Sequence, residues 1–160
     1  MERLTTNSVA EKAGVSVGSL YQYFPNKEAL VAEVRRRFDA AFRERLVAAL
    51  GRAGRLPLRE AVGEFVRTLV ALHAEDPQLH NAVSAGLPES ERTLIEQIVA
   101  SYLEAHRHEM RRPDLPLAAA VSLDVAEALI HGVALRSPER LGDDTFVMEV
   151  TDLLVRYLAR

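Results

Sequence analysis

Residues 6–28, TNSVAEKAGVSVGSLYQYFPNKE, contain the most informative pattern in the chain. They predict two short helices that join at Gly14 and a third helix that begins after Pro25. Thr5 or Thr6 is expected to cap the first helix, because a hydroxyl oxygen accepts an otherwise unpaired N–H of the first turn. Gly14 suits the left-handed conformation that commonly ends a helix. This order of elements is typical of the helix-turn-helix, a unit that docks on DNA.

The second helix is expected at Val17–Phe24, with Ser16 as its N-cap. Leu20 and Phe24 are four residues apart and should face the core. Gly18 lowers helix stability relative to alanine, so its presence favours the close approach of a bulky partner. The side chains expected to face outward are Val17, Gly18, Ser19, Tyr21, Gln22 and Tyr23.

Several of these side chains have the chemistry needed to bind nucleic acid. Ser19 and Gln22 can hydrogen-bond to base edges, and the hydroxyls of Tyr21 and Tyr23 can donate to phosphate. Lys27 opens the third helix, where a cation and a helix N-terminus together favour a phosphate group. The alternative for each aromatic residue taken alone is a place in the core of a helical bundle.

The ordered string of residues 5–34, TTNSVAEKAGVSVGSLYQYFPNKEALVAEV, resembles the DNA-binding signature of the tetracycline-repressor (TetR) family. The resemblance implies an all-α homodimer with three helices that bind DNA and a larger domain that binds a small ligand and dimerises. We therefore expect a helix-turn-helix DNA-binding domain at residues 1–45. A helical ligand-binding and dimerisation domain is expected at residues 46–160.

The same resemblance places the second helix of the motif in the major groove of double-stranded operator DNA. Ser16, the cap of that helix, belongs to the expected DNA-binding surface. The expected phosphate contacts are Thr6, Tyr21, Tyr23 and Lys27, and the residues expected to approach bases are Val17, Gly18, Ser19 and Gln22.

The start of the chain departs from the family pattern. Members usually carry an amphipathic helix of a dozen or more residues before the motif, and only four residues precede Thr5 here. Since four residues cannot form a stable helix of their own, we expect most of the first helix to be missing. The alternative function is therefore a helical dimer that binds a small molecule or a protein but does not itself read DNA.

The composition predicts a soluble, cytoplasmic protein. Of 160 residues, 48% are hydrophobic, 27% are charged and none is cysteine, which leaves no disulfide framework. We find no signal peptide and no uninterrupted apolar run of the ~18 residues that a membrane span needs. The net charge of −3 argues against nucleic acid. However, residues 1–45 carry two more basic than acidic residues, whereas the other 115 carry five more acidic ones.

Past the motif the hydrophobic period is helical to the end of the chain. Helices are expected at about residues 27–50, 57–75, 78–85, 88–110, 116–135 and 143–159. By resemblance the last two pair with their symmetry mates across a dimer interface, whereas the residues alone equally allow the last helix to close a monomer core. The expected interface residues are Val121, Val125, Leu129, Gly132, Phe146, Val150, Leu153, Leu154 and Tyr157.

A pocket for a small effector is expected between the helices of the larger domain. Its residue types suit an apolar or amphipathic ligand, with His73 or Tyr102 as polar anchors, and suit a packed core equally well. The candidate lining residues are Phe65, Leu69, His73, Leu79, Val83, Ile98, Tyr102 and Leu129.

No enzyme, cofactor or metal site is predicted. The familiar catalytic and nucleotide-binding motifs do not occur, and the histidines at 73, 80 and 131 are far apart in the sequence. Asp124 lies on an apolar helix and needs a partner, either an arginine or a ligand. The sequence as a whole predicts a ligand-responsive transcriptional repressor that binds a palindromic operator as a homodimer. Its ligand would bind the two conformational states differently and so weaken DNA affinity.

Overall fold

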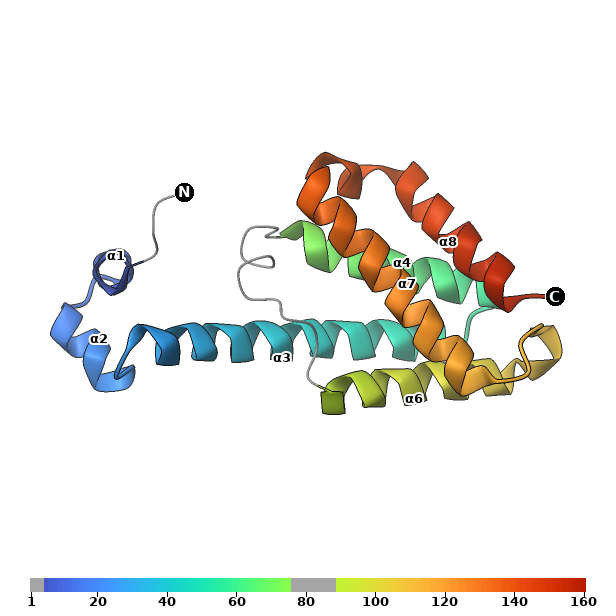
Figure 1. Cartoon of the computed structure of the whole chain (residues 1–160), viewed down its shortest axis with the longest axis horizontal. Coiled ribbons are helices and arrows are strands. Elements are labelled where there is room, and N and C mark those ends of the chain that lie inside the picture. Colours follow the sequence, from blue (N-terminus) through green and yellow to red (C-terminus); the bar gives the residue numbers. More distant parts are fainter. Residues whose placement is uncertain (1–4, 76–88) are drawn as a thin grey trace. The chain divides into compact units, whose positions relative to one another are not determined.

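A computed structural model describes residues 5–75 and 89–160, and within these ranges the chain is all-α with no strand (Figure 1). This confirms the expected fold class. The helix expected at 78–85 and the residues Leu79 and Val83 lie outside the described ranges. The α-helices are α1 (Thr6–Ala13), α2 (Val17–Tyr23), α3 (Lys27–Ala53), α4 (Leu58–Glu75), α6 (Glu89–Ala105), α7 (Leu115–Arg136) and α8 (Asp144–Leu158).

The chain forms two compact units, Met1–Ala40 and Ala41–Arg160. We call them the head and the body. The change from one to the other falls inside α3, five residues before the expected boundary at residue 45.

The turn between α1 and α2 is built by local hydrogen bonds, as the sequence predicts. The Thr5 hydroxyl accepts from the backbone N–H of Ser8 at 3.1 Å, and the Ser8 hydroxyl accepts from the N–H of Thr5 at 3.2 Å, which forms a capping box. Gly14 ends α1 with φ +69°, a left-handed conformation in which a side chain would be strained. Ser16 caps α2 by accepting from the N–H of Ser19 at 3.0 Å.

The core of the head is small. Ala10, Leu20 and Leu30, one from each of its helices, are buried and in contact. The half-buried side chains Val9, Val17 and Phe24 pack against them. The Leu20 contact with this core fixes which face of α2 points outward.

The body has a much larger core. Helix α7 packs against α4 and α6, and α8 packs against α4 (Figure 1). By length and composition alone α7 is long and apolar enough to cross a membrane, but these contacts make it the core helix of the body and not a membrane span. The largest fully buried side chains are Leu46, Val66, His73, Ile95, Leu103, Leu115 and Ile130.

One helix end and one short element differ most from the expectation. Helix α6 ends at Ala105 and not near residue 110, because the chain turns through a short 3₁₀ helix at Arg107–Glu109 and Met110 then pairs with Ala159. A second 3₁₀ helix, Pro138–Gly142, lies between α7 and α8 and was not predicted.

Candidate nucleic-acid interface

None of the residues that the structure describes covers the outward face of α2. Gly18, Tyr21, Gln22 and Tyr23 are all exposed, Tyr21 at 45% and Tyr23 at 78% of their surface. The face therefore has the composition and accessibility needed to contact a groove and its phosphates.

Two of the expected phosphate contacts meet across the turn. The Thr6 hydroxyl of α1 lies 3.3 Å from the Tyr21 hydroxyl of α2, and either oxygen can donate. This bond couples the first turn of α1 to the outward face of α2. A phosphate oxygen at this position would accept from whichever hydroxyl does not donate within the pair.

Two residues of the expected base-reading set are placed differently from the prediction. Val17 was expected to face outward, but it is half-buried and packs against the head core, because its position on the first turn of α2 brings it beside Leu20. Ser19 is half-buried, and its hydroxyl lies 2.8 Å from that of its cap residue, Ser16. Of the expected base-reading set, Gly18 and Gln22 are the residues that remain exposed.

The start of α3 presents a cation beside a capped helix end. Asn26 accepts from the backbone N–H of Ala29 at 2.7 Å, and Lys27 is exposed. The positive end of the helix dipole and the ammonium group act in the same direction on an approaching anion. The expected phosphate contact at Lys27 is therefore sterically open.

The arginine run in the middle of α3 is paired with acidic groups of the same helix. Arg36 donates from Nε and Nη2 to the Glu33 carboxylate at 2.8 Å each, and Arg37 donates from Nε at 2.7 Å. These hydrogen bonds lower the pKa of Glu33 to about 2. Arg35 pairs with Asp39 at 3.4 Å. Much of the positive charge of this run is neutralised within α3.

The body contains an apolar cavity of about 60 Å³. Of the eight expected lining residues, Phe65, Ile98 and Tyr102 are in its wall, and Leu69, His73 and Leu129 are not. Leu69 and His73 pack elsewhere in the core, and Leu129 is exposed. The wall consists of Leu50, Ala53, Leu58, Ala61, Val62, Phe65, Ile98, Val99, Tyr102, Leu103, Ser122, Leu123, Leu154 and Leu158.

Tyr102, one of the two expected polar anchors, is held by two contacts. Its hydroxyl donates to the carbonyl oxygen of Leu56 at 2.8 Å, and its ring stacks on His106 with centroids 4.3 Å apart. Burial raises the pKa of Tyr102 to about 12, so the phenol is neutral in this environment. A ligand that used this hydroxyl as a donor would have to replace the Leu56 carbonyl.

The expected dimer residues divide into an exposed and a buried set. Val150 and Leu154 are only 3% exposed, so they belong to the core of the subunit and offer no surface to a second chain. Gly132 is buried, with the Arg136 guanidinium over it. Leu129 and Leu153 are exposed, and Val121, Val125 and Phe146 are half-buried. Tyr157 lies half-buried under the Arg112 guanidinium, 4.3 Å from its ring centroid.

Comparison with known families decides the identity of the fold. The domain described as "Tetracyclin repressor-like, C-terminal domain" matches residues 57–158, and "Bacterial regulatory proteins, tetR family" matches residues 1–34. The chain belongs to the TetR family. Members of this family are transcription factors and not enzymes, so this TetR-family chain is a DNA-binding transcriptional regulator.

Solved structures agree with the family. A TetR-family regulator from Streptomyces coelicolor is 25% identical with a TM-score of 0.65, covering 98% of this chain and 86% of that one. FadR of Bacillus halodurans, a fatty acid degradation regulator, is 16% identical with a TM-score of 0.66, and the match covers 96% of this chain and 88% of FadR. SmeT, solved with triclosan, is 16% identical with a TM-score of 0.63, and the match covers 99% of this chain and 83% of SmeT. No protein with a curated description matches the sequence.

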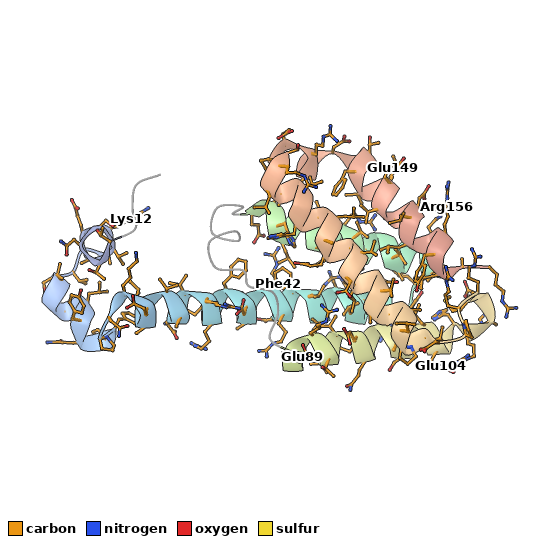
Figure 2. The ribbon with its side chains drawn as sticks, in the orientation of Figure 1. Lys12, Phe42, Glu89, Glu104, Glu149 and Arg156 are labelled. Carbon is orange, nitrogen blue, oxygen red and sulfur yellow. The ribbon has the colours of Figure 1, made fainter. Side chains whose placement is uncertain are left out.

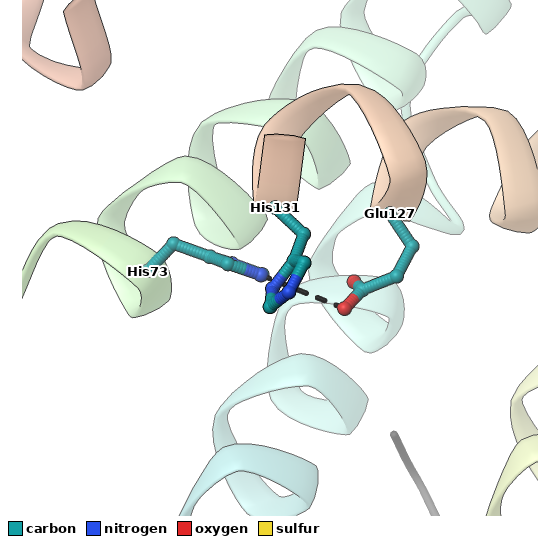
Figure 3. Close-up of side chains that lie close together, drawn as sticks. All are labelled: His73, Glu127 and His131. Carbon is teal, nitrogen blue, oxygen red and sulfur yellow. Dashed lines mark ion pairs between the residues drawn. The ribbon is translucent and has the colours of Figure 1, made fainter. Parts of the chain in front are cut away.

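The body of this TetR-family chain also holds a polar cluster that sequence reasoning missed. His73 of α4 and Glu127 and His131 of α7 point toward one another (Figure 3). The four-residue spacing of Glu127 and His131 was the one available signal, since it places both on the same face of a helix. Asp124, expected to be buried, is exposed and pairs with Arg92 of α6.

Proposed function

We propose that this TetR-family chain is a cytoplasmic repressor that binds a palindromic operator as a homodimer and releases it when an apolar effector enters the body. The outward face of α2 is the single observation that carries the proposal. Gly18, Tyr21 and Gln22 lie exposed on a helix whose other side is fixed by Leu20. Without a side chain at Gly18 the helix can approach the base pairs closely.

Specific base contact falls mainly on Gln22 under this proposal. A glutamine amide can pair with the N6 and N7 edge of adenine through two hydrogen bonds, each good pair being worth about 1–3 kcal/mol of discrimination. Thr6, Tyr21, Tyr23 and Lys27 hold the backbone and carry no sequence information. A two-fold dimer reads two half-sites that are one helical turn apart, roughly 34–36 Å.

The first experiment is an electrophoretic mobility shift with the promoter upstream of the gene, at low salt. We expect Gln22→Ala to weaken operator binding about 10-fold or more and to relax the preference over scrambled DNA. Gln97→Ala, an exposed glutamine of α6, is the matched control and should leave binding unchanged. If neither this chain nor a version extended at its N-terminus shifts DNA, the alternative of a helical dimer that does not read DNA is favoured.

The phosphate contact at Lys27 has a distinct signature. Lys27→Ala should weaken binding to all sequences alike and lower the salt slope of log affinity by about one unit, because one phosphate contact is lost. The sequence contains one other lysine, Lys12, at the last turn of α1 (Figure 2). Lys12→Ala removes the same charge from the head. An equal loss of slope in both variants would assign the effect to general charge and not to a phosphate at the start of α3.

The homodimer is supported by an apolar surface on α7 and α8. Half of the ten large hydrophobic side chains exposed in the described residues lie on these two helices: Leu117, Leu129, Leu135, Met148 and Leu153. Leu153→Glu should convert the dimer to a monomer in sedimentation experiments, because a charge in a packed interface is uncompensated. Leu94→Glu on α6 is the control, since Leu94 and Leu153 are 45% and 49% exposed. If both variants sediment like the wild type, this surface is not the interface.

The effector proposal follows from the size and lining of the cavity. A volume of about 60 Å³ is well below the roughly 300 Å³ of a typical ligand site, so an effector has to enlarge it by moving the surrounding helices. A ligand that binds the enlarged state better shifts the equilibrium toward it. SmeT, a structure of the same fold solved with triclosan, supports an apolar ligand.

Decanoate and triclosan are suitable probes for this site. We expect at least one of them to bind the body and release operator DNA, and Ala61→Leu, which fills the cavity, to abolish that binding while DNA affinity is retained. Ala61 is a buried member of the wall. If binding survives in Ala61→Leu, the effector binds at a site other than this cavity.

A further inference from the structure

We propose that His73, Glu127 and His131 form a binding site for a divalent transition-metal ion such as Zn²⁺, Co²⁺ or Ni²⁺. One donor atom from each residue lies within 4.8 Å of the other two. Two imidazoles and one carboxylate are a donor set that proteins use for zinc and for other first-row metals, with further positions left open. The site lies in the body, and its test does not depend on whether the chain binds DNA.

Two packed helices bring the donors together. Glu127 and His131 are four residues apart on α7 and therefore project from the same face on successive turns. His73 lies near the end of α4, and α4 packs against α7. Figure 3 shows the three side chains converging from the two helices. A metal held here would join α4 to α7.

The hydrogen bond of His73 fixes which ring nitrogen faces the cluster. Nδ1 lies 2.8 Å from the carbonyl oxygen of Leu69, and because a carbonyl only accepts, Nδ1 carries the proton. In the neutral ring the lone pair is then on Nε2, which lies 3.5 Å from Oε1 of Glu127. A backbone carbonyl bound to the distal nitrogen is the usual support of a metal-binding histidine.

The contact between Nε2 and the carboxylate is one that a cation between them would stabilise. A lone pair and a carboxylate oxygen repel each other at 3.5 Å, and His73 is fully buried, so bulk water does not screen the repulsion. A metal ion between the two atoms would replace this repulsion with attraction to both. His131 brings a second imidazole donor to the same point, and two imidazoles with one carboxylate are a metal-binding set.

The dimensions of the cluster suit a small cation. Ligand bonds of 2.0–2.1 Å in a tetrahedral site place donor atoms about 3.3 Å apart, close to the distance between His73 and Glu127. The Phe42 ring packs edge to face against the His73 ring, with their centroids 6.1 Å apart. The Glu127 side chain is 42% exposed, so it can move inward to close the remaining distance and leaves a path for the ion.

The test is metal binding by the full chain after treatment with a chelator. Co²⁺ is titrated with visible absorption as the readout, because the intensity of its bands reports coordination number, and Zn²⁺ is titrated by calorimetry. We expect one equivalent of either ion to bind and Mg²⁺ to fail as a competitor, because Mg²⁺ prefers oxygen ligands and water. Removal of one donor by Glu127→Gln or His131→Gln should weaken binding by more than about 100-fold, since loss of even an outer-shell partner costs 10–100-fold.

His108→Gln is the matched control. His108 is an exposed histidine beside Glu109, at 3.7 Å, and lies outside the cluster. The His108→Gln variant should bind metal like the wild type. Glu127→Gln keeps the shape of a partly exposed side chain, so circular dichroism should show an unchanged fold. Absence of stoichiometric Co²⁺ and Zn²⁺ binding in the wild type overturns the proposal. Equal binding by the wild type and Glu127→Gln overturns it as well.

Discussion

The head and the body bury their side chains on very different scales. The head closes on Ala10, Leu20 and Leu30, whereas the body buries residues from every one of its described helices. The candidate DNA-binding surface of the head lies on the exposed face of α2. The candidate sites of the body, the cavity and the histidine cluster, lie in its interior. A small unit specified by caps and one turn is thus joined to a larger unit specified by long-range packing.

The strongest test of this contrast is Leu20→Ala. Truncation of a buried leucine costs about 2–5 kcal/mol, which a core of three buried residues cannot absorb. We expect the head to lose its protection against hydrogen exchange while α4, α6, α7 and α8 keep theirs. Leu94→Ala, at an exposed position of α6 outside the proposed dimer surface, is the control and should change neither unit. A single cooperative loss of protection over the whole chain would contradict the independence of the two units.

The next effect concerns the turn. Gly14 has φ +69°, and a side chain there is strained by about 1–2 kcal/mol even though no atom lies within 4 Å of the Cβ position. Gly14→Ala should therefore lower the thermal stability of the head and leave the body unchanged, as seen by hydrogen exchange at several temperatures. The control is Gly142→Ala, where φ is negative and the Cβ position is also open. Equal losses in both variants would show that the conformation of Gly14 is not the cause.

Gly18→Ala should act in the opposite sense on stability. Gly18 lies inside α2, and an added Cβ would meet only the Ser16 hydroxyl at 3.8 Å, an ordinary contact. Alanine favours the helix by up to about 1 kcal/mol, so the head should become more stable. Operator binding should nevertheless weaken, because the new methyl group lies on the face proposed to approach the bases. A variant that is stabilised and binds the operator as well as the wild type would remove Gly18 from the interface.

The same contrast explains how far the sequence could be interpreted. The N-cap at Thr5 (one of two residues expected there), the left-handed Gly14 and the Ser16 cap all depend on residues within four positions, so a local pattern predicts them. Val17 was misplaced, because a residue in the first turn of a short helix can face either the core or the solvent.

The less accurate predictions lie in the body. The apolar stripe of α8 predicted a helix correctly, but it could not show that Val150 and Leu154 face α4 and not a second chain. His73 and His131 are separated by 57 intervening residues, and only the packing of α4 on α7 brings them together. A site of this kind has no local signal beyond the spacing of Glu127 and His131.

The smallest expected effect is a pH dependence in α3. Hydrogen bonds from Arg36 and Arg37 lower the pKa of Glu33 from its ordinary 4.5 to about 2, so the folded helix favours the ionised carboxylate. The resulting contribution to stability is complete above about pH 4.5 and is lost as the pH falls toward 2. Because the pair is exposed, the effect is small and should weaken in high salt. The loss of helix between pH 5 and pH 2.5, followed by circular dichroism, should be shallower in Glu33→Gln than in the wild type. Glu44→Gln, an exposed glutamate of the same helix, should titrate like the wild type, and identical curves for all three proteins would show that the Glu33 pairing does not persist in solution.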